Sequence, residues 1–595
     1  MTFRKLAEYF SQLEQTSSRL SMTEILSHLF RDVKSSEIDK VLYLLQGRIA
    51  PLYEKKEFLL GERMLIRALS KALNMEQKQF ISEYKKAGDL GKTIEILRKK
   101  VKIDEKKDLS IEGVFELLSK ITDTGGAGSQ EGKMAIIAEL VQNLDPLSTR
   151  FVVRIPTNTL RLGFSDMTML DAFSWMMNGD KSLRPEIEKA YHVRPDLGFI
   201  GKTLKEKGIV GLKHVKPALF TPIIMMKAER LSSAEDIIDK VGKGIVEPKY
   251  DGFRLQVHYR KKDHRVKLYS RGLEDVTFMY PDIERGVIRE VMADEIIFEG
   301  EAIGFDPATN SFLPFQETVQ RKRKYDIVAK AKEIPLKLFA FELLYADDIN
   351  YLTIPFEKRR KQLDKFIKLS GNKIEDTLLL SPEEIGDSVK KIELIFDDAV
   401  SKGLEGIMVK KLNGIYQPGA RGWNWIKFKR SYSSKIEDTI DCLIMGYDFG
   451  KGKRTGFGIG AFLVGVLDTK KDLFVTVAKI GTGLTDEEWR ELKKRTLKEK
   501  SNKQHARYEV DRIMDVDAWV KPSIVVEIRA DEITRSPTHT AGRILKKTST
   551  GNAYEVDIPG FALRFPRLER FRDDKRPNDV TTLKEVEKMY KKQKK

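Results

Sequence analysis

The spacing of the hydrophobic residues changes near residue 215, and this change limits what the chain can fold into. In the first part, Phe3, Leu6 and Phe10 stand three or four positions apart, as on one face of an amphipathic helix, and similar stripes continue to about residue 210. Further on, residues 253–259 alternate between hydrophobic and polar, which is typical of a half-buried strand. A helical region therefore precedes a region that contains a sheet.

The length of the chain indicates several domains, because 595 residues exceed what one hydrophobic core usually supports. We predict an all-α domain over residues 1–212, a mixed α/β domain over 213–430 and a β-rich domain over 431–595. The candidate strands are Phe253–Tyr259, Ile296–Ile303, Leu336–Phe341, Gly406–Lys410, Thr439–Tyr447, Ala461–Leu467, Phe474–Ile480 and Ser523–Ile528.

Charge and cysteine content narrow the classes of function. Lys and Arg number 107 against 89 acidic residues, and the net charge of +18 favours a polyanionic partner, nucleic acid before membrane. The single cysteine, Cys442, excludes a disulfide framework and a multi-cysteine zinc site. The sequence shows neither a long apolar run nor a signal peptide, so we expect a cytoplasmic protein with no membrane partner.

A candidate nucleophile, Lys249, lies in the segment Glu247-Pro248-Lys249-Tyr250-Asp251-Gly252, just before a candidate strand. A lysine attacks only as the amine, so its site must disfavour the ammonium form through desolvation or neighbouring positive charge. A pocket that also collects Arg254, Arg271 and Lys427 would provide that charge. By itself, Lys-x-Asp-Gly also fits an ordinary lysine at a strand edge.

Polar groups and aromatic rings follow Lys249 in an ordered series, each at the end of a short strand-like run. The series is Ser270-Arg271, Phe298-Glu299-Gly300-Glu301, Phe339-Ala340-Phe341-Glu342, Glu405-Gly406-Ile407-Met408-Val409-Lys410, Arg421 and Trp425-Ile426-Lys427-Phe428-Lys429. Strand ends that converge can gather several charges around a phosphate. The series therefore indicates a pocket for a phosphate-bearing ligand.

The ordered series resembles the motifs of ATP-dependent DNA ligases of the archaeal and eukaryotic replicative type, within the covalent nucleotidyltransferase superfamily. The resemblance covers essentially the whole chain, since Leu563–Arg567 and Arg572–Lys575 are similar to the family's motif VI. It implies a multidomain fold: an all-α DNA-binding domain, an α+β nucleotidyltransferase (adenylation) domain and a β-barrel OB-fold domain. It also implies sealing of 5′-phosphate/3′-hydroxyl nicks in duplex DNA, in replication, repair and recombination, through lysyl-AMP and adenylated DNA.

The resemblance implies roles for individual residues in nucleotide binding. Lys249 is the implied catalyst, which attacks the α-phosphorus of ATP, expels pyrophosphate and holds AMP. Glu247 is implied to help recognise adenine, and Phe341 to stack on the base, a use suited to a flat aromatic face. Glu301 is implied to bind the ribose.

A metal ion and several cations complete the implied pocket. Glu405 is the implied metal-linked carboxylate, assisted by Glu301, because phosphoryl transfer needs a hard cation such as Mg²⁺, with Mn²⁺ as the substitute. The implied cations are Arg254 and Arg271, near the ribose or the reacting phosphates, and Arg421, Lys427 and Lys429, at phosphate oxygens. In the third domain, Arg572 and Lys575 of motif VI are implied to orient the departing pyrophosphate.

Nicked double-stranded DNA is the implied partner of the helical domain, with most contacts to phosphates and a strong dependence on salt. The candidate contacts are Gly125, Gly126, Gly128 and Ser129 in one loop, together with Arg154 and Arg161. Backbone N–H groups beside a helix start can hold a phosphate. The two arginines fit structural ion pairs equally well.

A sliding clamp is a frequent partner in the family. The segment Gln77–Tyr84 partly matches a clamp-binding peptide, although Glu83 replaces one aromatic residue, and it also fits an ordinary helix face. We expect the protein to be a monomer.

Other functions fit parts of the sequence. An RNA ligase or a capping guanylyltransferase would share the lysine motif, but the large helical region and Arg564–Arg567 argue against it. An NAD-dependent ligase carries a cysteine-based zinc module, which Cys442 alone cannot build. A non-catalytic DNA-binding scaffold needs only the basic charge and not the series around Lys249. The segment Gly450–Gly456 lacks P-loop spacing, and we interpret it as a basic β-loop.

Overall fold

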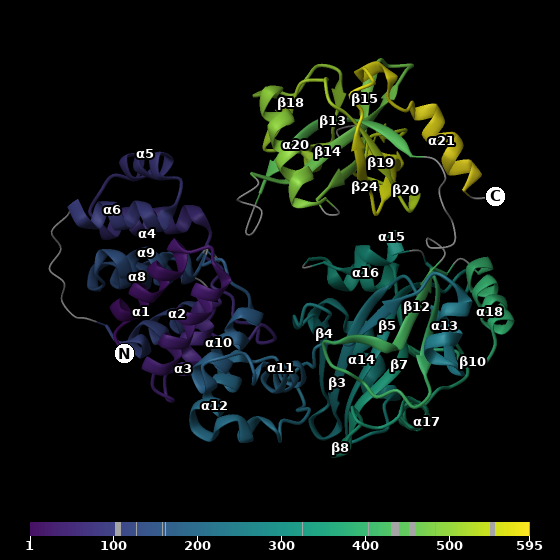
Figure 1. The fold of residues 1–595 in the computed structure, drawn as a ribbon, viewed down its shortest axis with the longest axis horizontal. Helices are drawn as coiled ribbons and strands as arrows, with labels where there is room; N and C mark the ends of the chain where they lie inside the picture. Colours follow the sequence, from purple (N-terminus) through teal and green to yellow (C-terminus); the bar gives the residue numbers. More distant parts are fainter. Residues whose placement is uncertain are drawn as a thin grey trace. The chain divides into compact units, whose positions relative to one another are not determined.

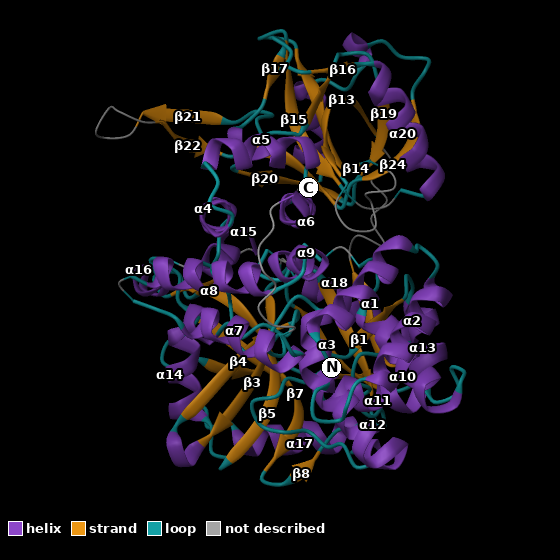
Figure 2. Ribbon diagram, turned by 90° about the vertical axis from the view of Figure 1, so that its left-hand side faces the viewer, coloured by secondary structure: helices purple, strands orange, loops and turns teal. Residues whose placement is uncertain are grey.

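The chain forms two compact units, residues 1–428 and 429–595. The computed structural model describes all residues except 101–108, 127, 158, 161, 314, 324, 403, 430–438, 451–457, 482–483, 548–553 and 594–595. The first unit contains a helical region followed by a region of packed sheets, and the second unit is rich in strands (Figures 1 and 2). The expected order of helical, mixed and strand-rich regions is therefore confirmed.

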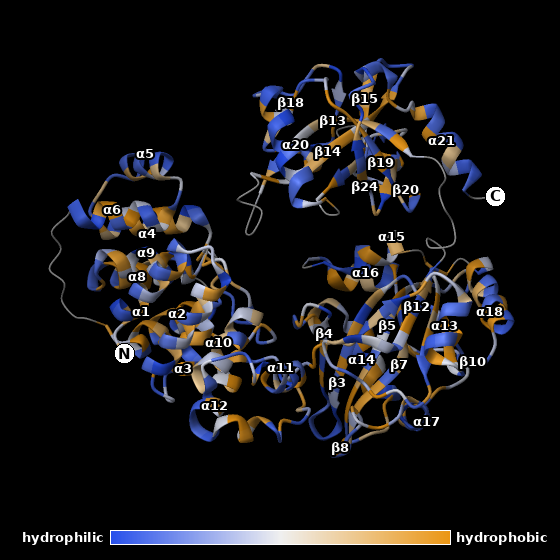
Figure 3. Ribbon diagram, in the orientation of Figure 1, coloured by the Kyte–Doolittle hydropathy of each residue, from blue (hydrophilic) through white to orange (hydrophobic). Residues whose placement is uncertain are grey.

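The helical region is built from amphipathic helices that share one core. The helices are α1 (Phe3–Gln15), α2 (Arg19–Asp32), α3 (Ile38–Leu45), α4 (Glu62–Ala72), α5 (Gln77–Ala87), α6 (Leu90–Lys100), α7 (Ile111–Asp123), α8 (Ser129–Asn143), α9 (Pro146–Arg154), α10 (Asp166–Asn178), α11 (Arg184–Val193) and α12 (Leu197–Leu212). Apolar and polar residues alternate along them (Figure 3), and Phe3, Leu6 and Phe10 are fully buried in their shared core. The three- and four-residue spacing thus predicted both the helices and their buried faces.

Two sheets form the middle region. Sheet I consists of β1 (Lys227–Arg230), β2 (Gly244–Lys249), β10 (Glu384–Gly386), β11 (Gly406–Lys411) and β12 (Arg421–Lys429), in the order β1-β12-β11-β2-β10. Sheet II consists of β3 (Phe253–Arg260), β4 (Arg265–Ser270), β5 (Glu295–Asp306), β6 (Ser311–Phe312), β7 (Leu336–Ala346), β8 (Ile349–Asn350) and β9 (Leu378–Leu380). Its order is β4-β3-β5-β7-β8, with β6 on β5 and β9 on β7. The strands predicted in this region are all present.

The two sheets are packed on one another and covered by helices on their outer sides. The helices are α13 (Ala234–Val241), α14 (Pro281–Glu290), α15 (Phe315–Thr318), α16 (Ile327–Glu333), α17 (Phe356–Phe366) and α18 (Val389–Ser401). Helices α13 and α18 share a core with sheet I, whereas α14 and α17 share one with sheet II. Between the sheets, Ile297 and Leu344 of sheet II share one buried hydrophobic cluster with Trp425 of sheet I.

Strand β3 differs from the half-buried strand that its alternating pattern predicts. Leu255, Val257 and Tyr259 face the core of sheet II, as expected. The polar residues between them, Gln256 and His258, are fully buried as well. They form hydrogen bonds with Phe220 and Ile223 in residues 219–226, the last part of the segment that connects α12 to β1. This face of β3 is therefore covered by the chain and not exposed to solvent.

The described residues of the second unit form one large sheet and two short two-stranded sheets. Its elements are β13 (Ile440–Phe449), β14 (Ile459–Asp468), β15 (Leu473–Ile480), α20 (Asp486–Lys498), β16 (Lys500–Ser501), β17 (Tyr508–Glu509), β18 (Ala518–Val520), β19 (Val525–Arg529), β20 (Glu532–Ser536), β21 (Ile544–Lys547), β22 (Tyr554–Ile558), β23 (Gly560–Arg564), β24 (Arg567–Phe571) and α21 (Leu583–Lys592). The large sheet has the order β16-β18-β13-β14-β15-β17, with β19 between β13 and β24, and the two short sheets are β20-β23 and β21-β22. Trp489 of α20 and Val586 of α21 lie in its core. Among the helices that the structure describes, none has the length and apolar character that a membrane span requires.

His258 makes the stability of the protein depend on pH. The backbone N–H of Phe220 donates to Nδ1 (3.0 Å), so the ring is neutral and its Nε2–H donates to Gln256 (3.0 Å). Burial lowers the pKa of His258 to about 3. Because the unfolded chain binds this proton below its ordinary pKa of 6.5 and the folded chain does not, stability is lost as the pH falls from 6.5 towards 3.

We therefore expect His258 to contribute up to about 1.4 kcal/mol per pH unit to the loss of stability in this window. The measurement is the free energy of unfolding at pH 7 and pH 5 for the wild type and for His258→Gln, which keeps an acceptor but does not titrate. The variant should lose less stability between the two pH values. An equal loss in both proteins would show that His258 is not responsible.

Candidate active site

Lys249 lies at the end of β2, where the pairing of β2 with β11 brings it to a carboxylate. In this antiparallel pair Lys249 is opposite Gly406, and the backbone N–H of Glu405 donates to the Lys249 carbonyl (3.2 Å). The Lys249 Nζ is 2.7 Å from Glu405 Oε2, and both side chains are half-buried. The structure thus brings together these two residues of the sequence series.

Gly252 allows the turn after Lys249 to approach sheet II closely. A Cβ atom at this position would lie 2.3 Å from the carbonyl oxygen of Ala302, so only glycine fits without a backbone shift. The turn leads directly into β3, where Arg254 is opposite Glu301 on β5. The glycine of the Lys-x-Asp-Gly pattern therefore brings Lys249 near these two side chains.

Glu301 has an electrostatic environment that suits a cation ligand. Burial raises the pKa of Glu301 to about 7, the charges of Asp251 and Glu405 act in the same direction, and Lys249 and Arg254 oppose them. In the described residues no group of three or more His, Cys, Asp or Glu could hold a metal ion. The pair Glu301 and Glu405 still fits Mg²⁺, which is commonly held by one or two carboxylates together with substrate phosphates.

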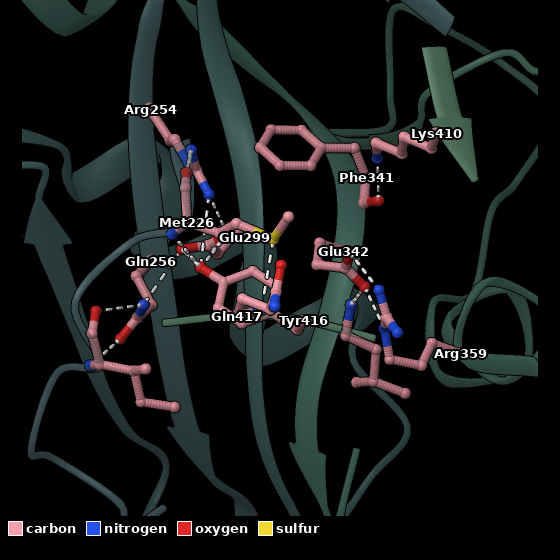
Figure 4. Close-up of polar contacts among 12 residues, drawn as sticks. Met226, Arg254, Gln256, Glu299, Phe341, Glu342, Arg359, Lys410, Tyr416 and Gln417 are labelled. Atoms are coloured by element: carbon pink, nitrogen blue, oxygen red, sulfur yellow. Dashed lines mark hydrogen bonds and ion pairs between the residues drawn. The ribbon is translucent and has the colours of Figure 1, made fainter. Parts of the chain in front are cut away.

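Phe341 forms one wall of the site between two cations (Figure 4). Arg254 lies 5.5 Å and Lys410 4.8 Å from its ring centroid, and the ring of Trp425 contacts it edge-on at 6.0 Å. Lys410 Nζ donates to the Phe341 carbonyl (2.8 Å) and to the buried carboxylate of Glu247 (2.9 Å). Burial raises the pKa of Glu247 and lowers the pKa of Lys410, and their mutual attraction opposes both shifts. Glu247 is therefore linked to Phe341 through Lys410.

The remaining predicted cations are distributed along two strands. Arg271 is exposed and directly follows β4, whose last residue, Ser270, is opposite Leu255 of β3. Lys427 and Lys429 are half-buried near the end of β12, whereas Arg421 is exposed at its start. Eight residues of strand span about 26 Å, so Arg421 and Lys429 cannot serve the same phosphate group.

The two motif VI residues are held within the second unit. Asp441, in β13, accepts hydrogen bonds from Arg572 (3.0 Å) and Lys575 (2.6 Å). Arg572 also binds Asp574 (2.7 Å) and lies 3.7 Å from Glu527. Carboxylates of the second unit thus neutralise both cations that are predicted to meet pyrophosphate.

Sequence reasoning missed the polar network behind the pocket. Glu299, Gln256 and Tyr416 are buried and joined by hydrogen bonds to Arg254 (Figure 4). The sequence signal for Gln256 was its polar character in a strand, which suggested a solvent-facing position. Tyr416 lies in the loop between β11 and β12 and had no signal in the spacing.

The glycine loop before α8 has the geometry of a helix start without a side-chain cap. Gly126 and Gly128 have positive φ angles of 82° and 78°, and no side chain of Gly128 or Ser129 caps the helix. A Cβ atom at Gly125, Gly126 or Gly128 would meet nothing within 4 Å. Exposed N–H groups at such a start can bind a phosphate, so this loop stays a predicted DNA contact.

The prediction of a DNA contact at Arg154 is wrong. The side chain is only 1% exposed and pairs with Asp89 (2.9 Å) and Glu14 (3.2 Å), because α9 packs on α6 and α1. A buried guanidinium of this kind cannot reach a DNA phosphate. Arg161 lies outside the described residues, as do residues 451–456 of the predicted basic loop Gly450–Gly456.

The predicted clamp-binding segment is corrected in the same way. Residues 77–84 lie in α5, and Phe80, the aromatic residue that would enter a pocket on a partner, is fully buried in the helical core. The segment is therefore an amphipathic helix of this core, and its aromatic anchor is not accessible.

Comparisons with known proteins agree with this arrangement. The chain matches the family models of the DNA ligase N terminus over residues 2–174, the ATP dependent DNA ligase domain over 225–429 and the ATP dependent DNA ligase C terminal region over 455–575. It is similar to a probable DNA ligase of Dictyoglomus thermophilum, with 44% identity over 100% of this chain and 98% of that protein. A DNA ligase of Saccharolobus solfataricus is 40% identical with the same coverage.

A solved structure titled Pmar-Lig_PreS3 supports the fold. It covers 95% of this chain and 99% of its own, with a TM-score of 0.53 and 18% identity. The helical region, the packed sheets around Lys249 and the strand-rich unit are those of a multidomain nucleotidyltransferase. This chain belongs to the ATP-dependent DNA ligase family. It is therefore an ATP-dependent enzyme that seals nicks in DNA.

We expect Arg154→Met to destabilise the protein without changing its contacts with DNA. Removal of one partner from a buried ion pair costs about 3–5 kcal/mol, because the other charge stays buried. Lys120→Met, at an exposed position of α7, is the control and should change stability by less than about 0.5 kcal/mol. The measurements are the free energy of unfolding and the slope of log binding constant against log salt concentration, which reports phosphate contacts. A reduced slope in the folded Arg154 variant would restore Arg154 as a DNA contact.

Proposed function

We propose that Lys249 is the residue that carries AMP in this ligase. The observation that supports this role is its position: Nζ lies 2.7 Å from Glu405 and is close enough to Glu301 to act on its pKa. Arg254 also acts on Glu301 and lies 5.5 Å from the Phe341 ring centroid. Lys249 reacts as the amine, after its ammonium proton has passed to water, and attacks the α-phosphorus of ATP. The new N–P bond replaces the bond to the bridging oxygen, and pyrophosphate leaves.

The next two steps transfer AMP to DNA and release it. An oxygen of the 5′-phosphate at the nick attacks the phosphorus of lysyl-AMP, so a P–O bond forms, the N–P bond breaks and Lys249 is restored. The 3′-hydroxyl then attacks the activated 5′-phosphorus, the phosphodiester forms and AMP leaves with the electron pair. Each step exchanges one bond to phosphorus, so the protein must mainly position groups and stabilise charge.

The pocket residues have separate proposed roles. Phe341 stacks on adenine, held by Lys410 and indirectly by Glu247. Glu301 binds the ribose, and Arg254 and Arg271 contact the ribose or the reacting phosphates. The cations proposed to contact phosphate oxygens are Arg421, Lys427 and Lys429. The distance along β12 between Arg421 and the two lysines supports different phosphates for them.

Glu405 and Glu301 are the proposed ligands of Mg²⁺ or Mn²⁺. When bound, such an ion offsets negative charge on the nucleotide phosphates. The raised pKa of Glu301 supports this assignment, because a carboxyl group buried near two other carboxylates gains from a nearby cation.

The three regions have proposed functions of their own. Residues 1–212 bind the nicked duplex, with the Gly125–Ser129 loop as a phosphate contact, residues 213–430 are the adenylation domain, and residues 431–595 are an OB-fold domain. Arg572 and Lys575 orient the pyrophosphate after exchanging Asp441 for it. A sliding clamp partner, the monomeric state and the cytoplasmic location stay predictions.

The test is covalent labelling of the purified protein with Mg²⁺ and α-labelled ATP, GTP or NAD, followed by a chase with 5′-phosphorylated nicked DNA. We expect a label from ATP that nicked duplex discharges with sealing. Label from GTP alone would assign the protein to capping, and discharge by RNA alone to RNA ligation. No label from any nucleotide would contradict the proposed chemistry.

Lys249→Ala should abolish the label while binding to nicked duplex persists, because the nucleophile is lost and the basic surface remains. Lys243→Ala, six positions earlier and exposed, is the matched control and should label like the wild type. Labelling that survives in Lys249→Ala would assign the nucleophile to another residue.

A further inference from the structure

A buried carboxylate, Glu299, is the centre of a hydrogen-bond network behind Phe341 (Figure 4). It accepts from Arg254 Nη2 (2.5 Å), from Gln256 Nε2 (3.1 Å) and from the Tyr416 hydroxyl, which lies 3.1 Å from each of its oxygens. Glu299 is fully buried, so its charge depends on these donors rather than on water.

Tyr416 and Arg254 bind the same residue of the connecting segment (residues 219–226). The Met226 N–H donates to the Tyr416 hydroxyl (2.8 Å), and Arg254 Nη1 donates to the Met226 carbonyl (2.8 Å). Burial keeps the pKa of Tyr416 far above its ordinary value, so the hydroxyl stays a donor to Glu299. The one hydroxyl therefore connects the Met226 N–H to the carboxylate that holds Arg254.

The orientation of Arg254 depends on these contacts. Among the described residues, its buried Nε has no hydrogen-bond partner, so the guanidinium is directed by Nη1 and Nη2 alone. Nη1 binds Met226 and Nη2 binds Glu299, the two groups that Tyr416 also binds. Nη2 in addition donates directly to the Tyr416 hydroxyl (3.4 Å). In this orientation the guanidinium lies 5.5 Å from the Phe341 ring centroid and 5.1 Å from that of Trp425.

We propose that Tyr416 is a positioning residue for adenylation, which acts by holding Glu299 and the Met226 backbone so that Arg254 faces the nucleotide. This inference rests on the proposed function of Arg254 at the ribose or the reacting phosphates. Without the hydroxyl, the Met226 N–H loses its acceptor and Glu299 loses a donor. Both supports of the guanidinium then become free to shift.

The first test compares Tyr416→Phe with Tyr269→Phe. Tyr269, on β4, is also buried and its hydroxyl donates to the Phe220 carbonyl (2.7 Å), so the control removes a similar bond to the same connecting segment away from Arg254. We expect kcat/KM for adenylation by ATP to fall about tenfold in Tyr416→Phe, as for loss of a hydrogen bond to a charged group, and less than about twofold in Tyr269→Phe. Unchanged adenylation in Tyr416→Phe, or equal losses in both variants, would overturn the proposal.

The second test asks whether Tyr416 acts through Arg254. In an Arg254→Lys background, which lacks the paired Nη contacts, Tyr416→Phe should add less than about twofold to the loss in kcat/KM. A tenfold loss in both backgrounds would mean that the tyrosine acts independently of Arg254 and would overturn the proposal. If Tyr416→Phe does not fold, Glu299→Gln, which keeps the side-chain shape, replaces it in the same cycle with the same expected outcomes. Failure of the wild type to form any adenylate would instead contradict the proposed function.

Discussion

Charged side chains buried between and beside the two sheets hold the pocket together, because each charge is tolerable there only with its partner. Arg254 pairs with Glu299, Lys410 with Glu247, and Glu342 with Arg359. Removing a charge from water is costly, and the cost is offset only if the geometry is good and the remaining donors and acceptors are satisfied. These pairs therefore allow few arrangements of the strands that carry them. They specify how the strands are aligned within the sheets and do not merely hold the sheets together.

The pocket takes its shape from this buried layer. Lys410 binds both Glu247 and the Phe341 carbonyl. These bonds fix the backbone that carries the Phe341 ring, which is proposed to stack on adenine. The pairing of β2 with β11 sets the distance between Lys249 and Glu405, and the close approach at Gly252 brings Glu301 to the same place. A nucleophile on rigid strands is positioned more accurately than one on a loop.

The second unit uses ion pairs in a different way. Asp441 holds Arg572 and Lys575 at a half-buried position, where water and other anions can replace it more easily than in the core. A phosphate group carries more charge than one carboxylate and accepts several hydrogen bonds. This difference in burial supports the proposal that Arg572 and Lys575 exchange Asp441 for pyrophosphate, whereas Arg254 pairs with the fully buried Glu299.

The sequence by itself determined the kinds of elements, their order and the family, because periodicity reports local geometry and the ordered series from Lys249 to Lys429 reports shared chemistry. It also predicted one site for Lys249, Glu405, Glu301, Arg254 and Phe341, of which the structure brings Lys249 to Glu405 and Arg254 to Phe341. Only the tertiary structure decided that Arg154 and Phe80 are buried, that both faces of β3 are covered, and that Tyr416 lies behind Arg254. Whether a polar side chain is buried depends on contacts with segments that are far away in the sequence. Asp89 and Arg154 are 65 positions apart, and Tyr416 and Met226 are 190 apart. The spacing of residues along the sequence therefore does not predict such contacts.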